Sequence, residues 1–536
     1  DPIVLVENID LGTEMLTVKK QITIDLNGKK VTSTAKKAFE VYANATIKNG
    51  TIEAANRCVD TRKAVELTLT DVTLIADKYI SAYGNPQPLT IGGSENGTKV
   101  TMTNVKISAE AGYAIITFVE TELTATGSTI GGYNALYVKP GSENSVFNFV
   151  DTDLSGSTGG NDVEGTSFST IAVRADNVTV NVDAASTVTA SGKYCWAISM
   201  ESTHTDEKGI TGSTVTVAGT IIGQVLNSVD TKNNTVSVKE EYADELKAAG
   251  YTFKIANGMA TVVAPVASIN GVNYATLEDA FAAAADGETI VLLADATPAL
   301  TSQRAITKAT VIDLNGKTLT LKEDDLYFGT TTFKNGKIVV DSSVNASTAV
   351  FWMFEGQTLT FEGVEIVATG VTGTYLIGIN GGSNSAVNLI DSTITIENAS
   401  QAGLSAVICD NGNGNKVVIE GSTINVANIK GRFYLGGTNG SIDVENSNVT
   451  LNGVKEGFYL RAGQSLAIEG TSKVDVTLNA DSEPRYGINV TDITAEYTVA
   501  TTATVNATVY EIVPAAMIGT NKYASLQAAI NAVKNG

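Results

Sequence analysis

The residues that could carry acid–base, metal or thiol chemistry are few in this chain and lie far apart. The single histidine, His204, lies in the polar stretch Glu201 to Lys208, which excludes reactions that need two histidines and argues against a histidine-based zinc site. The three cysteines, Cys58, Cys195 and Cys409, fit neither a metal-binding spacing nor a disulfide framework. We therefore expect buried free thiols and no bound cofactor.

One acidic segment partly matches a calcium-binding loop. The sequence DTDLSGSTGGND places oxygen-bearing side chains at its positions 1, 3, 5 and 12 and Gly156 at position 6. The match is incomplete, because the last position is Asp where Glu is usual and the start of the segment aligns with an ordinary strand corner at Asp391. A plain corner and a calcium site both remain open, and the calcium ligands would be Asp151, Asp153, Ser155 and Asp162.

A group of aromatic and basic residues in the second half could line a sugar-binding face. Its members are Arg432, Arg461 and Arg485 with Tyr434, Tyr459 and Tyr486. Tyrosine and arginine also occur singly on ordinary protein exteriors. The sequence therefore leaves both a carbohydrate-binding groove and a plain surface open.

Enzymes that cleave glycans need clustered carboxylates, or calcium with an arginine or lysine base. Asp324 and Asp325 are adjacent, but consecutive residues of a strand point to opposite faces, and a solvated loop is expected there. No nucleophile elbow, phosphate loop or dinucleotide fingerprint occurs in a strand-to-helix context. We predict that the chain is not an enzyme.

The composition describes an ordered, acidic, mainly β protein. Of 536 residues, 43% are hydrophobic, and 36 basic against 57 acidic side chains give a net charge of −21. This charge balance offers no basic face for phosphates, so nucleic-acid binding is not expected. No run approaches the roughly 18 apolar residues of a membrane span, so no direct membrane insertion is expected. The 50 glycines and 8 prolines, with frequent Thr, Val, Ile and Asn, favour strands interrupted by tight turns.

The chain contains two copies of one long module. IDLNGKKVTS from Ile24 returns as IDLNGKTLTL from Ile312, and IKNGTIEA from Ile47 returns as FKNGKIVV from Phe333. Within each copy an apolar strand, an Asn, Asp or Gly corner and a second strand recur every 22 to 33 residues. This is the pattern of a β-solenoid, in which each repeat forms one coil.

The coils are placed by their first strands. In the second copy these start at Thr331, Leu359, Val387, Val417, Ile442 and Leu466, and in the first copy at Ala45, Leu67, Val100, Leu123 and Phe147, with weaker versions near Val178 and Val215. We expect left-handed backbone and stacked asparagine side chains at the corner pairs Asn27-Gly28, Asn49-Gly50, Asn315-Gly316 and Asn335-Gly336.

Between the copies the pattern changes into a small α+β joint. It contains a short helix over 240–250, a hairpin around Asn257 and Gly258, and a capping helix that starts with Thr276 and ends at Gly287. The predicted organisation is a first β-helix module over 1–239, the joint over 240–287, a second module over 288–513 and a C-terminal strand and capping helix over 514–536.

The last segment repeats the internal capping helix, and the opening DPIVLVENID matches ETIVLLADAT from Glu288. Either the chain is one stretch of a longer tandem array, or the C-terminal helix of one molecule caps the first coil of the next. In the second case the partner is a second copy, and the interface would contain Ile3, Leu5, Tyr523, Leu526, Ala529, Ile530 and Val533.

The run YATLEDAFAAAADGETIVLLAD followed by IDLNGK and repeated coils resembles the pectin-lyase-like right-handed parallel β-helix superfamily, and more closely its non-enzymatic, adhesin-like bacterial surface branch. The paired-Asp and Gly-His-Gly patterns of the family's hydrolases are absent, and so is the Arg-rich signature of its pectate lyases.

The resemblance implies two right-handed β-helix modules in an extracellular or cell-surface protein. The first residue, Asp1 rather than Met, indicates a processed or trimmed chain. Its role would be structural or adhesive, as a rod-like spacer or fibre subunit with weak glycan contacts. A glycan-binding module or a polysaccharide-degrading enzyme is the alternative.

Overall fold

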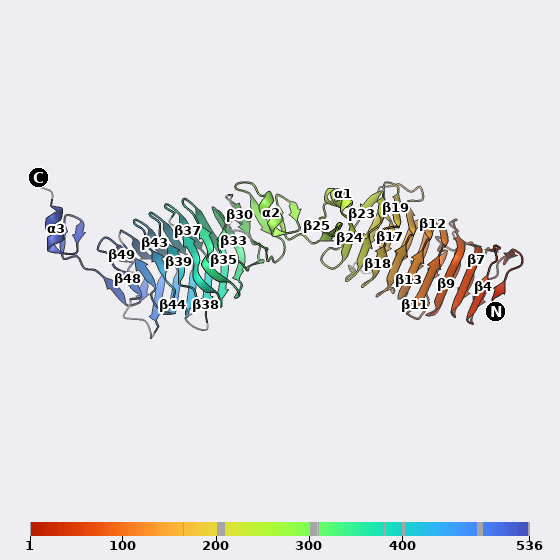
Figure 1. The fold of residues 1–536 in the computed structure, drawn as a ribbon, viewed down its shortest axis with the longest axis horizontal. Coiled ribbons are helices and arrows are strands. Elements are labelled where there is room, and N and C mark those ends of the chain that lie inside the picture. The colour runs from red at the N-terminus through yellow and green to blue at the C-terminus, as the bar shows by residue number, and fades with distance from the viewer. Residues whose placement is uncertain are drawn as a thin grey trace. The chain divides into compact units, whose positions relative to one another are not determined.

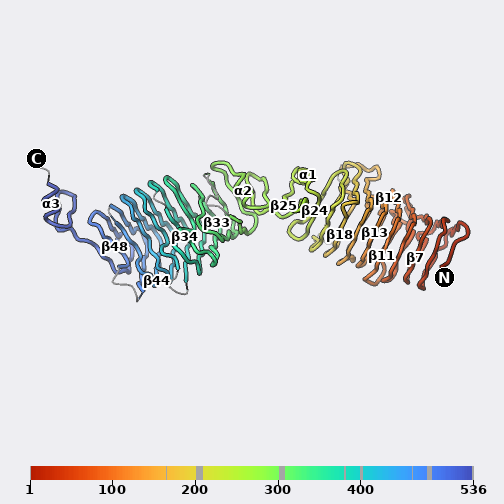
Figure 2. The backbone as a smooth tube through the Cα atoms, viewed as in Figure 1, coloured from red at the N-terminus to blue at the C-terminus, as the bar shows by residue number. Residues whose placement is uncertain are grey.

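A computed structural model describes residues 2–164, 166–200, 209–300, 308, 310–379, 382–398, 403–461, 463–479 and 486–533. The chain divides into two compact units, Asp1–Ala264 and Pro265–Gly536, and each is a stack of β-coils (Figures 1 and 2). The division falls inside the expected joint, so the short helix and hairpin belong to the first unit and the capping helix to the second. The single histidine lies outside the described residues.

Each complete coil contributes three strands, and equivalent strands of successive coils pair in parallel into three faces. The mainly β solenoid expected from the repeats is confirmed. The repeat pattern contained only the first and second faces, whereas the third face is an addition that the structure reveals. Several long strands turn a corner, so that one strand serves two faces.

In the first unit, the first face consists of β1 (Ile3–Val4), β4 (Ile22–Asp25), β7 (Ala45–Ala54), β9 (Glu66–Ile75), β11 (Thr98–Thr103), β13 (Thr121–Thr126), β15 (Val146–Val150), β18 (Thr179–Val182), β21 (Thr214–Val217) and β24 (Thr235–Lys239). The second face adds β2 (Ile9–Asp10), β5 (Lys30–Ser33), β16 (Asp153–Ser157), β19 (Thr187–Ser191) and β22 (Thr220–Ile222) to parts of β7, β9, β12 (Lys106–Thr117) and β14 (Thr129–Val138). The third face contains β3 (Leu16–Val18), β6 (Lys37–Val41), β8 (Arg57–Thr61), β10 (Leu89–Ile91), β17 (Phe168–Val173), β20 (Cys195–Met200), β23 (Gln224–Leu226) and the ends of β12 and β14.

In the second unit, the first face consists of β29 (Thr289–Leu292), β30 (Thr310–Asp313), β33 (Thr331–Val340), β35 (Thr358–Thr369), β37 (Ala386–Ile390), β40 (Lys416–Glu420), β43 (Ser441–Glu445), β46 (Ser465–Glu469) and β49 (Glu496–Val499). The second face adds β31 (Thr318–Leu321), β38 (Thr393–Glu397), β41 (Thr423–Ala427), β44 (Asn448–Val454), β47 (Lys473–Leu478) and β50 (Thr504–Asn506). The third face contains β32 (Leu326–Tyr327), β34 (Asn345–Met353), β36 (Thr372–Ile379), β39 (Ala406–Asp410), β42 (Phe433–Leu435), β45 (Phe458–Leu460), β48 (Ile488–Val490) and β51 (Val509–Glu511).

The registers of the first faces agree with the repeat spacing. Thr331 lies opposite Leu359, and that residue lies opposite Val387. The row continues through Val417, Ile442 and Leu466. In the first unit the row from Ala45 to Phe147 is also in register, but the next coil pairs through Val180 rather than Val178.

The corners use left-handed backbone, as expected. Among the described residues, every non-glycine residue with positive φ is Asn or Asp, including Asn27 at 51° and Asn315 at 49°. The side chains do not form the expected uniform asparagine stack, because Asn27 Nδ2 donates to Leu5 O at 3.1 Å and Asn49 Nδ2 donates to Asp25 Oδ1 at 3.0 Å. These two corners are therefore tied to the preceding coil.

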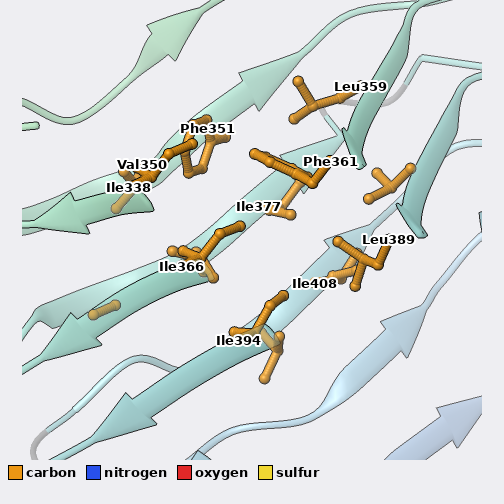
Figure 3. Close-up of a cluster of buried hydrophobic side chains, with 14 of the residues drawn as sticks. Ile338, Val350, Phe351, Leu359, Phe361, Ile366, Ile377, Leu389, Ile394 and Ile408 are labelled. Atoms are coloured by element: carbon orange, nitrogen blue, oxygen red, sulfur yellow. The ribbon is translucent and has the colours of Figure 1, made fainter. Parts of the chain in front are cut away.

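The core of each unit is a column of inward side chains, one layer per coil. Figure 3 shows such layers in the second unit, where Phe351, Phe361, Ile377 and Ile408 point into the same interior. All four are at most 1% exposed, and the Phe361 ring stacks on Phe333 with centroids 5.5 Å apart. Apolar area buried in this way is the main source of stability of a stack of coils that are individually unstable.

The expected hairpin and helix follow the last coil of the first unit. The 3-10 helix η1 (Glu240–Tyr242) and helix α1 (Ala243–Ala248) precede β25 (Thr252–Ala256) and β26 (Met259–Val263). The hairpin turns at Asn257 and Gly258, both with positive φ, and β26 pairs antiparallel with β24. The hairpin thus covers the edge of that strand.

The second unit begins with β27 (Ala267–Ile269), β28 (Val272–Tyr274) and α2 (Leu277–Ala283), which we call the internal capping unit (residues 265–287). Thr276 caps the helix by accepting the N–H of Asp279, as expected. The helix ends before Gly287, because Ala284 already has an extended ψ of 135°. The C-terminal capping unit (residues 514–536) contains β52 (Ala516–Ile518), β53 (Asn521–Tyr523) and α3 (Leu526–Ala532). No helix in the described residues is long and apolar enough to span a membrane.

Candidate functional site

The third face of the second unit carries one aligned row of outward positions, one per coil. Its members in register are Tyr327, Trp352, Gly378, Cys409, Tyr434, Tyr459, Asn489 and Tyr510. Their strand neighbours point inward: Phe433, Phe458 and Ile488, for example, are completely buried. The alternation of a strand therefore turns this row away from the apolar core, and its aromatic members are at least partly exposed, whereas Gly378 and Cys409 are buried.

Two tyrosines of this aligned row form the centre of a groove. The rings of Tyr434 and Tyr459 stack with centroids 5.5 Å apart. The guanidinium carbon of Arg432 lies 4.5 Å from the first ring centroid and 5.2 Å from the second, and that of Arg461 lies 5.9 Å from Tyr459. Guanidinium groups at this distance are attracted by the negative face of an aromatic ring.

A buried carboxylate of the groove contacts two of the other lining residues. Glu456 is 3% exposed, and its Oε2 lies 2.8 Å from Nη1 of Arg432. Its other oxygen, Oε1, accepts a hydrogen bond from Asn489 Nδ2 at 3.0 Å. Because a buried charge is stable only when paired and hydrogen-bonded, this chain of contacts across neighbouring coils fixes the orientation of the arginine.

The remaining charge of the groove is positive. Within the described part of the chain, Arg461 has no carboxylate within ion-pair distance, and the Tyr459 hydroxyl beside it raises the pKa of its guanidinium. Tyr486, which stacks on Tyr510 at 4.6 Å, completes the wall. The groove has a volume of about 350 Å³ and is lined by Arg432, Tyr434, Glu456, Tyr459, Arg461, Tyr486 and Asn489.

The structure thus brings together five of the six residues that the sequence suggested for a sugar-binding face, while Arg485 lies outside the described residues. Sequence reasoning missed Glu456 and Asn489. Both follow from the repeat register, because Asn489 is the residue opposite Tyr459 and Glu456 lies two residues before the strand that carries this tyrosine. The third face had to be recognised before that register could be used.

The third face of the first unit carries two other clusters of charged and aromatic side chains. Asp60 is fully buried and pairs with Arg57 at 2.9 Å and Lys37 at 2.7 Å. Farther along, Tyr137 lies under the cations of Lys139 and Arg174, at 5.5 and 5.3 Å from the ring centroid. The first cluster is thus a buried carboxylate between two cations, and the second is an aromatic ring beneath two cations.

The candidate calcium ligands do not form one loop. Asp153 and Ser155 lie in strand β16, opposite Thr129 and Gly131 of β14, whereas Asp151 is a positive-φ corner residue. Asp162 is exposed beyond the end of that strand. No group of three or more His, Cys, Asp or Glu able to hold a metal occurs among the described residues, and calcium binding stays a prediction.

The expected assembly residues are largely exposed apolar side chains. Ile3 is 53% exposed, and Leu526, Ile530 and Val533 are 65%, 55% and 60% exposed. Leu5 and Ala529 are buried at 7% and 5%, and Tyr523 is half-buried.

Comparison with known proteins does not assign this chain to a family. No family model matches the chain, and no curated protein matches it. A solved structure of a PL6-family alginate lyase, in a mutant form, aligns over 94% of this chain and 97% of that chain, at 10% identity and a TM-score of 0.19. The parallel β-helix follows from the strand pairings themselves, and a match this weak carries no argument about a shared reaction.

The matched structure is that of an enzyme, so the prediction that this chain is not an enzyme is withdrawn, although a match at this similarity assigns no reaction to the chain. We correct that prediction and leave catalysis to be measured. Membership of the adhesin-like branch is not confirmed.

Proposed function

We propose that this chain is a structural, adhesive β-helical protein that binds carbohydrate in the groove of the second unit. The proposal includes an extracellular or cell-surface location, as the resemblance implies. The observation that carries it is the stacked pair Tyr434 and Tyr459 with Arg432 held over both rings. Stacked coils provide a rigid support for such a surface.

The chemistry of the groove suits a sugar ring. A pyranose has a face of C–H groups, which packs on an aromatic ring, and a rim of hydroxyl groups, which need donors and acceptors. Here the tyrosine side chains line the groove with both ring atoms and hydroxyl groups, and Arg461 supplies hydrogen-bond donors beside them. Among the described residues Arg461 has no carboxylate partner, and its charge favours a sugar that carries an acidic group.

Binding of the full chain to immobilised neutral and acidic glycans, followed by calorimetry with each bound glycan, tests this proposal. We expect Tyr459→Ala to weaken binding at least tenfold, which corresponds to about 1.4 kcal/mol. Tyr327→Ala is the matched control, because Tyr327 belongs to the same aligned row but stacks on Phe354, outside the groove.

Equal affinity of Tyr459→Ala and the unchanged protein would refute the assignment of the groove, and binding to none of the glycans would refute the function. Chromatography of the glycan after incubation separates binding alone from binding with cleavage.

A further inference from the structure

The two capping units have the same local structure, 249 residues apart (267 to 516). In the C-terminal unit Ala516 lies opposite Tyr523, as Ala267 lies opposite Tyr274 in the internal one. Helix α3 begins at Ser525, whose side chain accepts the N–H of Ala528, as Thr276 accepts that of Asp279 in α2. The fold of the capping unit therefore forms in both places.

The two units differ in what covers their apolar face. In the internal unit the helix packs on the first coil of the second β-helix, and its apolar residues Leu277, Phe281 and Ala284 are 1%, 8% and 1% exposed. The aligned residues of the C-terminal unit are Leu526, Ile530 and Val533, at 65%, 55% and 60% exposed. An apolar face of this size exposed to water favours association with a complementary surface.

The first coil of the chain has the same backbone as the coil that receives the internal capping unit. Ile3 lies opposite Ile24 in β4, as Ile290 lies opposite Ile312 in β30. The corner asparagine of the second coil also makes the same contact in both places, since Asn27 Nδ2 donates to Leu5 O and Asn315 Nδ2 donates to Leu292 O, both at 3.1 Å.

The face of this first coil that corresponds to the covered face in the second unit is open. It contains an apolar hollow of about 530 Å³, lined by residues that include Ile3, Leu5, Ile9, Leu16 and Ile24. Among the described strands, β1 pairs only with β4, so its other edge has no partner. In the second unit the equivalent edge, that of β29, pairs antiparallel with β27.

We propose that the C-terminal capping unit of one copy of this chain docks onto the first coil of a second copy. The geometry is that in which the internal capping unit packs on the first coil of the second unit. Strand β52 then pairs antiparallel with β1 of the partner copy. The internal register, Ile269 opposite Ile290 and Ala267 opposite Leu292, becomes Ile518 opposite Ile3 and Ala516 opposite Leu5. Helix α3 places Leu526, Ile530 and Val533 over the apolar hollow.

The contact between the internal capping unit and the first coil of the second unit also predicts a backbone hydrogen bond between the two copies. Leu293 N donates to Val266 O at 2.8 Å, and the aligned atoms are Val6 N on the first coil and Ala515 O on the capping unit. Strand addition satisfies the open edge, and the helix removes apolar surface from water. Because each copy uses two different surfaces, the contact is heterologous. An assembly of any length keeps one free first coil at one end and one free capping unit at the other, so further copies can add.

The test uses the full chain and two single variants, Ile530→Asp in α3 and Ile3→Asp in β1. Sedimentation of the unchanged chain is expected to show a mass that rises with concentration above the 55.7 kDa of one chain, while each variant stays at that mass. Since each variant keeps one intact surface, an equimolar mixture is expected to form a one-to-one complex and nothing larger.

Val163→Asp is the matched control, because Val163 is 61% exposed on a loop away from both surfaces, and it is expected to assemble like the unchanged chain. Circular dichroism of each variant establishes that the coils are folded, and Leu526→Asp replaces Ile530→Asp if that variant unfolds. A chain that stays at the mass of one copy at all concentrations overturns the proposal. Assembly that neither variant weakens, or variants that fail to complement each other, overturns the proposed geometry.

Discussion

Ser422 Oγ accepts the backbone N–H of Ser392 at 3.0 Å, and both side chains lie buried at the corner between the first and second faces. The contact repeats in the next coils, where Ser447 Oγ accepts from Ser422 N and Ser472 Oγ accepts from Ser447 N. In the first unit Thr152 occupies such a position and accepts from Ser128 N. A hydroxyl ladder thus satisfies the buried amides of this corner.

Removing one hydroxyl of the ladder should leave a buried N–H unpaired. We expect Ser422→Ala to lower the free energy of unfolding of the second unit by about 1–3 kcal/mol, measured by urea titration. Ser422→Thr retains the hydroxyl and should cost less. Ser441→Ala, at a half-buried position on β43 outside the ladder, is the control and should change the free energy by less than about 0.5 kcal/mol. Equal effects at Ser422 and Ser441 would show that the ladder does not contribute.

Truncating a phenylalanine in the core of the second unit should lower the free energy of unfolding by more than the loss of one ladder hydroxyl. Phe361 is fully buried between neighbouring coils, so Phe361→Ala should cost about 3–5 kcal/mol through lost apolar burial and the cavity left behind. Unfolding of this unit by urea is followed by the fluorescence of Trp352, in a protein in which Trp196 of the first unit is replaced by Phe. Phe354→Ala is the control, because Phe354 is 38% exposed. A loss no larger than that of the control would contradict the packing described here.

Asp410 should make the stability of the second unit depend on pH. It occupies an inward position opposite Ile379 and Leu435 and is fully buried, and burial raises the pKa of its carboxyl above the usual 3.8. Between the ordinary and the raised pKa, the folded state keeps a proton that the unfolded state has released. The Asp410 contribution to stability is therefore highest below the ordinary pKa and is lost as the pH rises through the raised pKa.

Asp410→Asn removes this titration while keeping an acceptor for Gly412 N and Asn415 Nδ2. Urea titrations at pH 4 and pH 7 should show a smaller loss of stability with rising pH in the variant than in the unchanged protein. Glu420→Gln, at an exposed position on β40, should not alter that difference. The same pH dependence in Asp410→Asn and the unchanged protein would count against this role.

The three cysteines should be unreactive in the folded protein. Cys58, Cys195 and Cys409 are free thiols buried in the structure, and burial raises the pKa of Cys195 to about 11 and that of Cys409 above its usual value. Since the thiolate is the reactive form, we expect no reaction with a disulfide reagent in native buffer and reaction of all three in denaturant. Equal rates in both conditions would contradict their burial.

Much of the first face could be predicted from sequence because its signal is local. An apolar alternation followed by an Asn, Asp or Gly corner recurs in each coil, so the starts Thr331, Leu359 and Val387 fall opposite one another in the structure. The cap of α2 at Thr276 was predictable for the same reason, since the capping box lies within four residues.

The third face was not predictable in this way. Several of its strands are short, as in Phe433–Leu435 and Phe458–Leu460, and the connections before them vary in length, so no fixed spacing reveals them. The contact of Arg432 with Glu456 joins two coils through that face, and its geometry depends on a register that only the folded stack sets. The acidic segment at Asp151 matched the pattern of a calcium-binding loop in sequence. In the structure its residues from Asp153 onward pair with the neighbouring strand β14 and form β16 instead.

The aligned row on the third face has a consequence for how such a protein can diversify. Adjacent coils are paired through backbone atoms and inward side chains, so exchange of an outward residue such as Tyr459 leaves the backbone pairing and the apolar core in place. Exchange of single outward residues can then alter what the surface recognises, coil by coil, while the scaffold is inherited unchanged. A repeat protein of this kind can acquire a new specificity without having to evolve a new fold.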